Sequence, residues 1–315
     1  RNVLSATYAS KIVLWDIVAG KEVRKYEGYT INGRSHESML SAYFSPDGRY
    51  ALSASNLAPK IWNISTGEET QRFIGHKRIR AVAFSPDGKY VLTGGEIKAG
   101  GARNDSTLML WDATSGKEIR TFPGHSSFIY AVAFSPDGKY ALSGSGDNTL
   151  KLWEVASGRE IRALTGHLSS IYAVAFSPDG RFVLSGSVDD TLKLWEAATG
   201  REIRTFTGHA SSVESVAFSP DGRNAVSGGL DGTARIWDIS TGKEIRTLKG
   251  EGRSDFVRSA VYSPDGRYVL AARGEASLLW SAATGNELCR MITFDDGEWI
   301  VITPEGYFNA SPNGA

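Results

Sequence analysis

The 315-residue sequence is poor in the features that mark several common classes of protein. Cys289 is its only cysteine, which excludes a disulfide framework and a cysteine zinc site within this sequence and is typical of a reducing compartment. No apolar run approaches the length of a membrane-spanning helix, and no signal peptide is visible. The 35 basic and 35 acidic side chains cancel, so composition gives no preference for nucleic acid or an anionic membrane. We expect a cytoplasmic protein with a large apolar core.

What the sequence does have is a repeat. One copy, GHSSFIYAVAFSPDGKYALSGSGDNTLKLWEVASGREIRALT, runs from Gly124 to Thr165, and two near-copies follow it directly. A spacing of 42 residues accordingly separates Trp153, Trp195 and Trp237. A fixed period of this length indicates stacked or radially arranged units, none of which can bury its apolar surface alone.

Each copy predicts four antiparallel strands joined by tight turns. Ser135-Pro136-Asp137-Gly138 ends the first strand, with Pro and Gly at the positions that a type I turn favours. The first three strands are almost continuous in apolar or small residues, which is typical of strands covered on both faces. The fourth, such as Glu202 to Phe206, alternates apolar and charged residues. This pattern suits an outer strand, because the charges keep its free edge from pairing with another chain. Sheets of this kind are expected to pack as blades around a common axis.

The repeats resemble those of the WD-repeat β-propeller family, in the bacterial type whose copies are nearly identical. Gly-His, Ser-Pro-Asp-Gly, a turn Asp and a Trp-Asp or Trp-Glu pair follow one another in the family's order along nearly the whole chain. The resemblance implies an all-β, seven-bladed propeller of four-stranded antiparallel blades in a single domain, residues 1–315. The expected blades are residues 1–28 with 298–306, then 36–74, 75–123, 124–165, 166–207, 208–249 and 250–294.

The two ends of the chain complement each other in this alignment. Asn2 to Ala6 matches a second strand, so blade 1 lacks its first strand, whereas Trp299 to Thr303 matches a first strand. We expect Trp299 to Thr303 to join blade 1 as its innermost strand and to close the ring, because closure removes exposed edges. The alternative is that this strand begins an eighth blade. Because the chain begins with Arg1 rather than Met, we also expect a segment upstream of it.

Four of the five histidines recur once per repeat. In the WD-repeat family this histidine belongs to a buried network with a turn Asp, a Ser or Thr of the second strand and the Trp of the third. The resemblance therefore implies four structural sets: His76, Thr93, Asp105, Trp111; His125, Ser143, Asp147, Trp153; His167, Ser185, Asp189, Trp195; and His209, Ser227, Asp231, Trp237. Blade 2 offers His36, Ser53, Asn56 and Trp62. Blades 1 and 7 have Ala9 and Gly274 where the Asp would stand, so we expect them to be looser.

A Ser-His-Asp group also suggests a hydrolase, but a catalytic triad is needed once and this group occurs at least four times. We therefore interpret the sets as structural hydrogen-bond networks. The sequence contains no phosphate-binding Gly-rich loop before a helix and no nucleophile elbow, and it leaves no spare histidine for a metal. We expect no catalytic residue, no metal site, no cofactor and no enzymatic activity in this segment.

One position varies between first strands that otherwise all but repeat. It lies four residues before the strand's final aromatic residue or its equivalent, and it is occupied by Leu40, Arg80, Tyr130, Tyr172, Glu214, Arg258 and Glu298. In a propeller these seven rim residues would surround the mouth of the central channel, and insertions at residues 29–35 and 96–104 would fall on the same face. A mixed rim with Tyr and Arg is typical of a protein or peptide contact surface. The alternative is unselected variation at a solvated edge.

These features predict a non-catalytic scaffold that binds a protein or peptide partner. The alternative is a sensory or regulatory module of a longer bacterial protein, whose kinase, NTPase or caspase-like peptidase domain lies outside this segment. The basic cluster of Lys77, Arg78 and Arg80 is too short to indicate nucleic acid in a chain of zero net charge. We expect no membrane association and a monomer as the default state.

Overall fold

The computed structural model describes residues 2–7, 11–16, 19–27, 30–31, 34–35, 39–55, 58–97, 106–250, 256–274, 276–293 and 298–311. The chain forms two compact units, unit 1 (residues 1–165) and unit 2 (residues 166–315). The regular secondary structure in the described ranges consists of β-strands. The all-β prediction is therefore confirmed.

The described residues of unit 1 form four sheets of consecutive antiparallel strands and one short hairpin. The first sheet is β1 (Asn2–Thr7), β2 (Lys11–Asp16) and β3 (Lys21–Glu27), and the hairpin is β4 (Thr30–Ile31) and β5 (Arg34–Ser35). The second sheet is β6 (Met39–Phe44), β7 (Tyr50–Ser55), β8 (Lys60–Asn63) and β9 (Glu69–Arg72). The third is β10 (His76–Phe84), β11 (Tyr90–Ile97), β12 (Ser106–Asp112) and β13 (Glu118–His125). The fourth is β14 (Ile129–Phe134), β15 (Tyr140–Ser145), β16 (Thr149–Glu154) and β17 (Glu160–Thr165).

In unit 2 the residues that the structure describes form three sheets. The first is β18 (Ile171–Phe176), β19 (Phe182–Ser187), β20 (Leu192–Glu196) and β21 (Glu202–Phe206). The second is β22 (Val213–Phe218), β23 (Asn224–Gly229), β24 (Ala234–Asp238) and β25 (Glu244–Leu248). The third is β26 (Val257–Tyr262), β27 (Tyr268–Arg273), β28 (Ala276–Ser281), β29 (Glu287–Thr293), β30 (Trp299–Ile302) and β31 (Phe308–Ala310).

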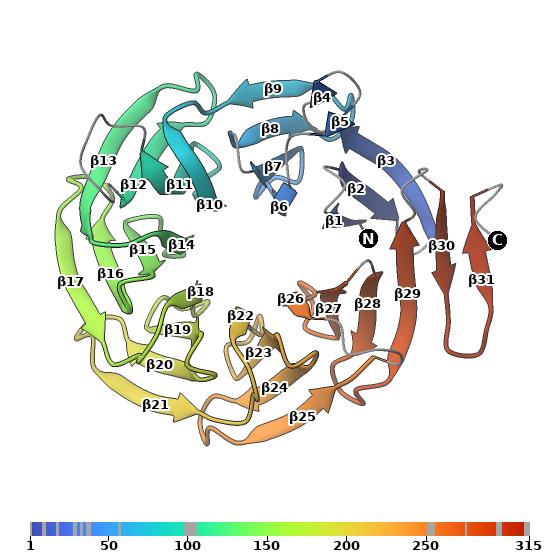
Figure 1. Cartoon of the computed structure of the whole chain (residues 1–315). Coiled ribbons are helices and arrows are strands. Elements are labelled where there is room, and N and C mark those ends of the chain that lie inside the picture. The colour runs from blue at the N-terminus through green and yellow to red at the C-terminus, as the bar shows by residue number, and fades with distance from the viewer. Residues whose placement is uncertain are drawn as a thin grey trace. The chain divides into compact units, whose positions relative to one another are not determined.

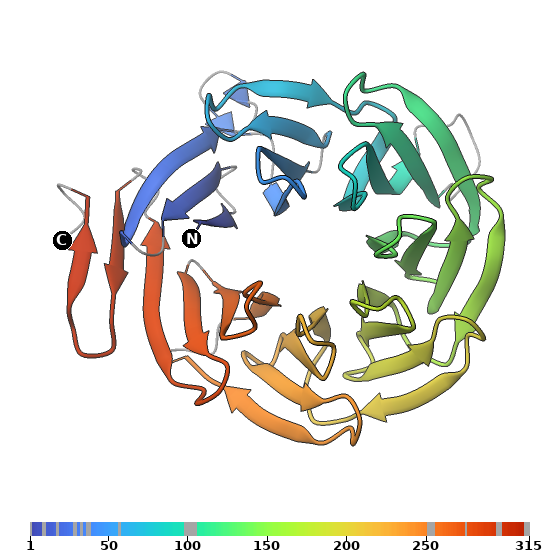
Figure 2. The ribbon, with the colours of Figure 1, turned by 180° about the vertical axis from the view of Figure 1, so that it is seen from behind.

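These seven sheets are the blades of a seven-bladed β-propeller, as predicted. In each unit the first strand of a sheet lies on the inner side and later strands lie progressively further out (Figure 1), and the view from behind shows the same order (Figure 2). The Ser-Pro-Asp-Gly turns set the spacing of the first two strands. In the fourth sheet the Ser135 hydroxyl donates to Asp137 Oδ1 at 2.6 Å, and the Gly138 N–H donates to the Ser135 carbonyl at 2.9 Å. Gly138 has φ +70°, a left-handed conformation that favours glycine.

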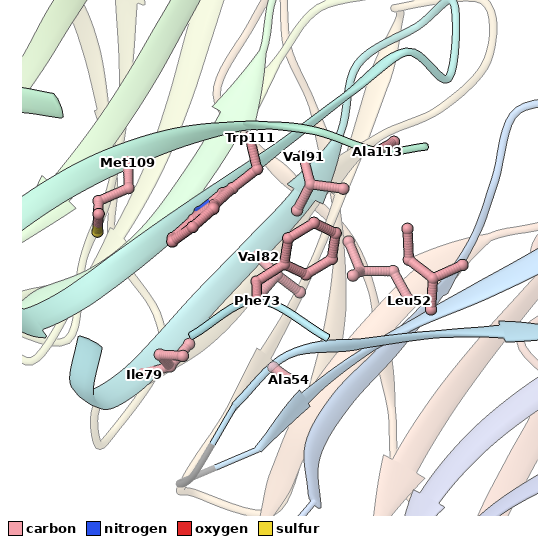
Figure 3. Packing of buried hydrophobic residues seen from close by; sticks show 10 residues of the cluster. Leu52, Ala54, Phe73, Ile79, Val82, Val91, Met109, Trp111 and Ala113 are labelled. Atoms are coloured by element: carbon pink, nitrogen blue, oxygen red, sulfur yellow. The ribbon is translucent and has the colours of Figure 1, made fainter. Parts of the chain in front are cut away.

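Within each unit the core lies between neighbouring sheets, where one blade covers the apolar face of the next. Phe73, which follows β9, is fully buried among Leu52, Val82, Val91 and Trp111 (Figure 3). The rings of Phe73 and Trp111 are 5.7 Å apart and tilted by 54°. Full burial of a Phe side chain contributes roughly 1.5–3 kcal/mol, so the repeats are stabilised mainly by contact with their neighbours.

The predicted closure of blade 1 by the C-terminal strand is wrong. β30 pairs with β29, with Met291 opposite Val301, and β31 pairs with β30, so the last sheet has six strands. The described N-terminal sheet keeps three strands. Only five residues separate Thr293 from its partner Trp299, and a short connection between consecutive antiparallel strands favours a local hairpin.

Candidate functional site

Six of the seven rim residues lie at the same structural feature, an interruption in the pairing of the first and second strands of a sheet. In β14, Ile129 pairs with Ser145 and Ala131 with Gly144, so Tyr130 is the extra residue of a β-bulge. Equivalent shifts leave one residue unpaired in β6, β10, β18, β22 and β26, and the residues concerned are Leu40, Arg80, Tyr172, Glu214 and Arg258. A bulge bends its strand and redirects a side chain, and bulges are frequent beside functional sites. We call these six the bulge residues.

Unit 1 presents basic and aromatic side chains at this feature. Arg78 and Arg80 of β10 are exposed, and neither guanidinium has a hydrogen-bond or ion-pair partner among the described residues. Tyr130 is half-buried, and its ring centroid lies 6.2 Å from that of Phe128. The side chains of Leu40 and Lys77 lie outside the described part of the structure.

Unit 2 combines charges of both signs. Arg258 Nη1 lies 3.9 Å from Glu214 Oε2, and the Arg258 guanidinium lies 5.7 Å from the centre of the Phe256 ring. Burial raises the pKa of Glu214 although Arg258 opposes the shift, and Glu214 Oε1 is buried with no hydrogen-bond partner among the described residues. Tyr172 is half-buried. Glu298 precedes β30, whose pairing with β29 has no register shift, so it does not share the bulge.

Three of the predicted histidine sets are assembled completely, one in each of the sheets β14–β17, β18–β21 and β22–β25. In the second of these, His167 Nδ1 is 2.8 Å from Asp189 Oδ2, and His167 Nε2 is 2.7 Å from Ser185 Oγ. Trp195 Nε1 donates to the same hydroxyl at 2.8 Å. The same contacts, within 0.1 Å, join the sets that contain His125, Ser143, Asp147, Trp153 and His209, Ser227, Asp231, Trp237.

The hydrogen-bond chemistry of these sets is satisfied with a neutral imidazole. The carboxylate only accepts, so Nδ1 carries the proton, and the hydroxyl can then donate to Nε2 while it accepts from the indole. Burial lowers the pKa values of His167 and His209 despite the neighbouring carboxylates, which favours this neutral form. Burial alone would raise the pKa of Asp231, but hydrogen bonds from the Ala210 N–H, Thr233 and His209 lower it to about 2.

Two sets are only partly described. His76 Nε2 is 2.7 Å from Thr93 Oγ1, and Trp111 Nε1 donates to that oxygen at 2.8 Å, but Asp105 lies outside the described residues. Burial lowers the pKa of His76 to about 4. In the second sheet Trp62 Nε1 donates to Ser53 Oγ at 3.0 Å, whereas His36 and Asn56 lie outside the described residues. Ala9 of the first sheet and most of the predicted insertion at residues 96–104 also lie outside them.

Sequence reasoning missed a threonine in each complete set. The Thr191 hydroxyl donates to Asp189 Oδ1 at 2.6 Å, and Thr149 and Thr233 do the same for Asp147 and Asp231. The signal was present, because each Thr stands two residues after its Asp in every complete copy. Each Asp therefore receives hydrogen bonds at both oxygens, which explains why it is held as a carboxylate.

No group of three or more His, Cys, Asp or Glu residues that could hold a metal is present in the described ranges. Nor does any helix in those ranges have the length and apolarity needed to span a membrane.

Repeated four-stranded blades with a His-Asp-Ser-Trp network define a propeller of the repeat type. The family model "WD40: WD domain, G-beta repeat" matches residues 67–112, 116–154, 158–196, 200–238 and 242–278. These matches cover well over half of the sequence, and the chain belongs to the WD40 family. Membership of this family indicates a protein-interaction role.

The chain is similar to fungal proteins named nuclear distribution protein PAC1. It is 30% identical over 145 residues to PAC1 of Coccidioides posadasii (strain C735), which covers 41% of this chain and 29% of the relative. It is 34% identical over 145 residues to PAC1 of Arthroderma otae (strain ATCC MYA-4605 / CBS 113480), which covers 40% of this chain and 30% of the relative. The match therefore spans less than a third of the length of these curated relatives.

These relatives correct one expectation. The near-identical repeats suggested a bacterial protein, but the matched proteins are fungal, so the bacterial assignment is contradicted. Similarity between copies within a chain records how the repeats were duplicated and carries no physical information about the organism.

Proposed function

We propose that this chain is a non-catalytic scaffold that binds a protein or peptide partner through its bulge residues. The observation that carries the proposal is that six of the seven variable positions coincide with a β-bulge. The buried neighbours on the same strands repeat, as with Ile129 and Ile171, because packing fixes them. The bulge frees one residue in each of these six first strands from that constraint, so its identity can be set by a partner.

The chemistry of the bulge residues suits a protein partner. Tyr and Arg are the residue types that most often dominate binding energy at protein interfaces. Unit 1 offers Arg80 and Tyr130, and unit 2 offers Tyr172 and Arg258, with the exposed Phe256 beside Arg258. Only two of the bulge residues, Arg80 and Arg258, are basic, which is too few for the many phosphate contacts that nucleic-acid binding uses. We also propose a cytoplasmic location and a monomeric state.

The proposal is tested by affinity capture with two matched variants. The first replaces the bulge residues Arg80, Tyr130, Tyr172 and Arg258 by Ala. The control replaces four other exposed residues by Ala, namely Arg49, Arg181, Arg223 and Tyr307. We expect the control to recover the same partners as the unmodified chain and the bulge variant to lose them. Recovery of the same partners by both variants would refute the assignment.

A second candidate rests on the relatives. The chain matches less than a third of each PAC1 protein, so it also fits the interaction module of a longer protein with a role in nuclear distribution. Expression of this chain in a PAC1-deficient fungus tests the idea. Restored nuclear distribution, lost again in the bulge variant, would favour it, and no restoration by a well-folded chain would count against it.

A further inference from the structure

An arginine of the outermost strand joins neighbouring blades in three places. Arg24 of β3 donates from Nη1 and Nη2 to the carbonyls of Thr66 and Ser65, at 2.8 and 2.9 Å. Arg204 of β21 donates to Thr241 and Ser240, both at 2.8 Å. Arg246 of β25 repeats the contact on Thr284 and Ala283, both at 2.7 Å. In each case the acceptors are two successive carbonyls in the last turn of the next sheet.

Arg120 of β13 occupies the same position but makes no such contact. The aliphatic part of the Arg120 side chain lies against the next turn as that of Arg204 does. A Cβ atom added to Gly158 of that turn would be 2.5 Å from Arg120 Cδ, and one added to the equivalent Gly242 would be 2.4 Å from Arg204 Cδ. Its guanidinium nevertheless has no hydrogen-bond or ion-pair partner among the described residues, and its Nε is buried.

The turn that faces Arg120 differs in one residue. Where Arg204 is bonded, Asp238 Oδ1 accepts the Thr241 N–H at 2.7 Å and holds the turn. The corresponding residue opposite Arg120 is the longer Glu154, whose Oε2 accepts the Ser157 hydroxyl at 2.5 Å. The two other bonded turns also begin with short side chains, Asn63 and Ser281, which accept backbone N–H groups of their turns. The Glu is thus a feature that separates Arg120 from the bonded arginines Arg24, Arg204 and Arg246.

The unbonded guanidinium lines a groove of about 420 Å³ between β13 and the turns of the fourth sheet. Ile119 and Tyr140 line the same groove and are 43% and 38% exposed. The acids of the groove are already engaged, since Asp137 accepts from Ser135 and lies 3.6 Å from Lys139 Nζ, and Glu154 accepts from Ser157. A second hollow of about 310 Å³ shares Tyr90, Asp137 and Gly138 with the groove and lengthens it.

We propose that this groove binds an acidic peptide segment of a partner protein, with an Asp or Glu carboxylate on the Arg120 guanidinium. The forked donor geometry of arginine matches a carboxylate. The exposed faces of Ile119 and Tyr140 take an adjacent apolar side chain, which distinguishes a peptide from a small free anion. The site is independent of the bulge residues, since the Ser-Pro-Asp-Gly turn lies at the other end of β14 from Tyr130.

NMR titration with two blocked peptides, acetyl-Gly-Leu-Glu-Leu-Gly-amide and its Glu-to-Gln counterpart, tests the site. We expect the Glu peptide to shift the Arg120 Nε–H and Ile119 methyl signals. We expect Arg120→Gln to weaken its binding by about tenfold or more, the loss expected for a charge-assisted hydrogen bond. Arg204→Gln is the matched control, because that guanidinium is bonded: it should lower the melting temperature and leave peptide binding unchanged.

Glu154→Asp supplies the converse variant. We expect the shorter acid to restore the turn seen beside Arg204, to draw Arg120 onto its carbonyls and to weaken peptide binding without removing the arginine. Equal binding of the Glu and Gln peptides, undiminished binding to Arg120→Gln, or equally tight binding of acetate alone would each overturn the proposal. The bulge variant should bind the peptide as the unmodified chain does, so failure here is distinguishable from failure of the proposed function.

Discussion

The Ser185 hydroxyl joins two other members of its set, because it contacts both His167 and Trp195. Ser185→Ala would leave the indole N–H and the imidazole nitrogen unpaired in a site from which water is excluded. We expect the free energy of unfolding to fall by about 1–3 kcal/mol, measured by denaturant titration. The exposed Ser126→Ala should change it by less than about 0.5 kcal/mol. Equal effects would show that the network is not a structural lock.

His76 makes stability depend on pH. Burial holds its pKa at about 4 in the folded chain, against 6.5 when unfolded, so the unfolded chain binds more protons between these values. Stability from the neutral ring is fully present above pH 6.5 and is lost as the pH falls toward 4, by an amount on the order of 3 kcal/mol. We expect urea denaturation to show this decline and His76→Gln to reduce it. An unchanged pH profile in the variant would contradict the assignment.

At the scale of the element, the bulge gives two neighbouring side chains of β18 different roles, one in the core and one at the surface. Ile171 is fully buried and packs into the core, whereas Tyr172 is the half-buried residue at the bulge. We expect Ile171→Ala to destabilise the protein by about 2–5 kcal/mol and Tyr172→Ala by clearly less, measured by thermal or urea denaturation. If Tyr172→Ala proved the more damaging change, its side chain would belong to the core rather than to a binding surface.

The first and last sheets have no His-Asp pair among the described residues, in contrast to the sheets β14–β17, β18–β21 and β22–β25. The described part of the first sheet has three strands, and the turn of the last carries Gly274 in place of the Asp. We expect amide hydrogen exchange in β1–β3 and β26–β29 to be faster than in β18–β21, because fewer side-chain hydrogen bonds oppose opening. Equal protection in all three sheets would show that backbone pairing alone sets the rate.

Sequence alone predicted the strands well because the turns are chemically explicit. Ser-Pro-Asp-Gly, Gly158 and the Asp turns mark where each strand ends, and the period shows that the pattern recurs. The bulges could not be read in the same way. A register shift depends on the second strand as well as the first, so the sequence showed that Tyr130 and Tyr172 stand at a variable position but not why that position is free.

At the scale of the whole molecule, the repeat shows which position in a blade a strand resembles but not which strand it pairs with. Trp299 to Thr303 was correctly placed as a strand, and β30 and β31 even pair as first and second strands do, yet β30 extends the last sheet. The choice between a local partner and a distant one is a balance of loop entropy and edge burial that no single stretch encodes. The repeated pattern therefore predicted the seven blades and failed on the last connection.

We propose that partners of this chain contact its bulge residues. Site-specific photo-crosslinking tests it most directly, with p-benzoylphenylalanine placed in turn at Arg80, Tyr130, Tyr172 and Arg258, and at the exposed outer-strand residues Val23 and Ile245 as controls. We predict that a partner captured by the unmodified chain forms covalent adducts with the four bulge positions and with neither control. Adducts confined to Val23 and Ile245, or equal yields at all six positions, would contradict it.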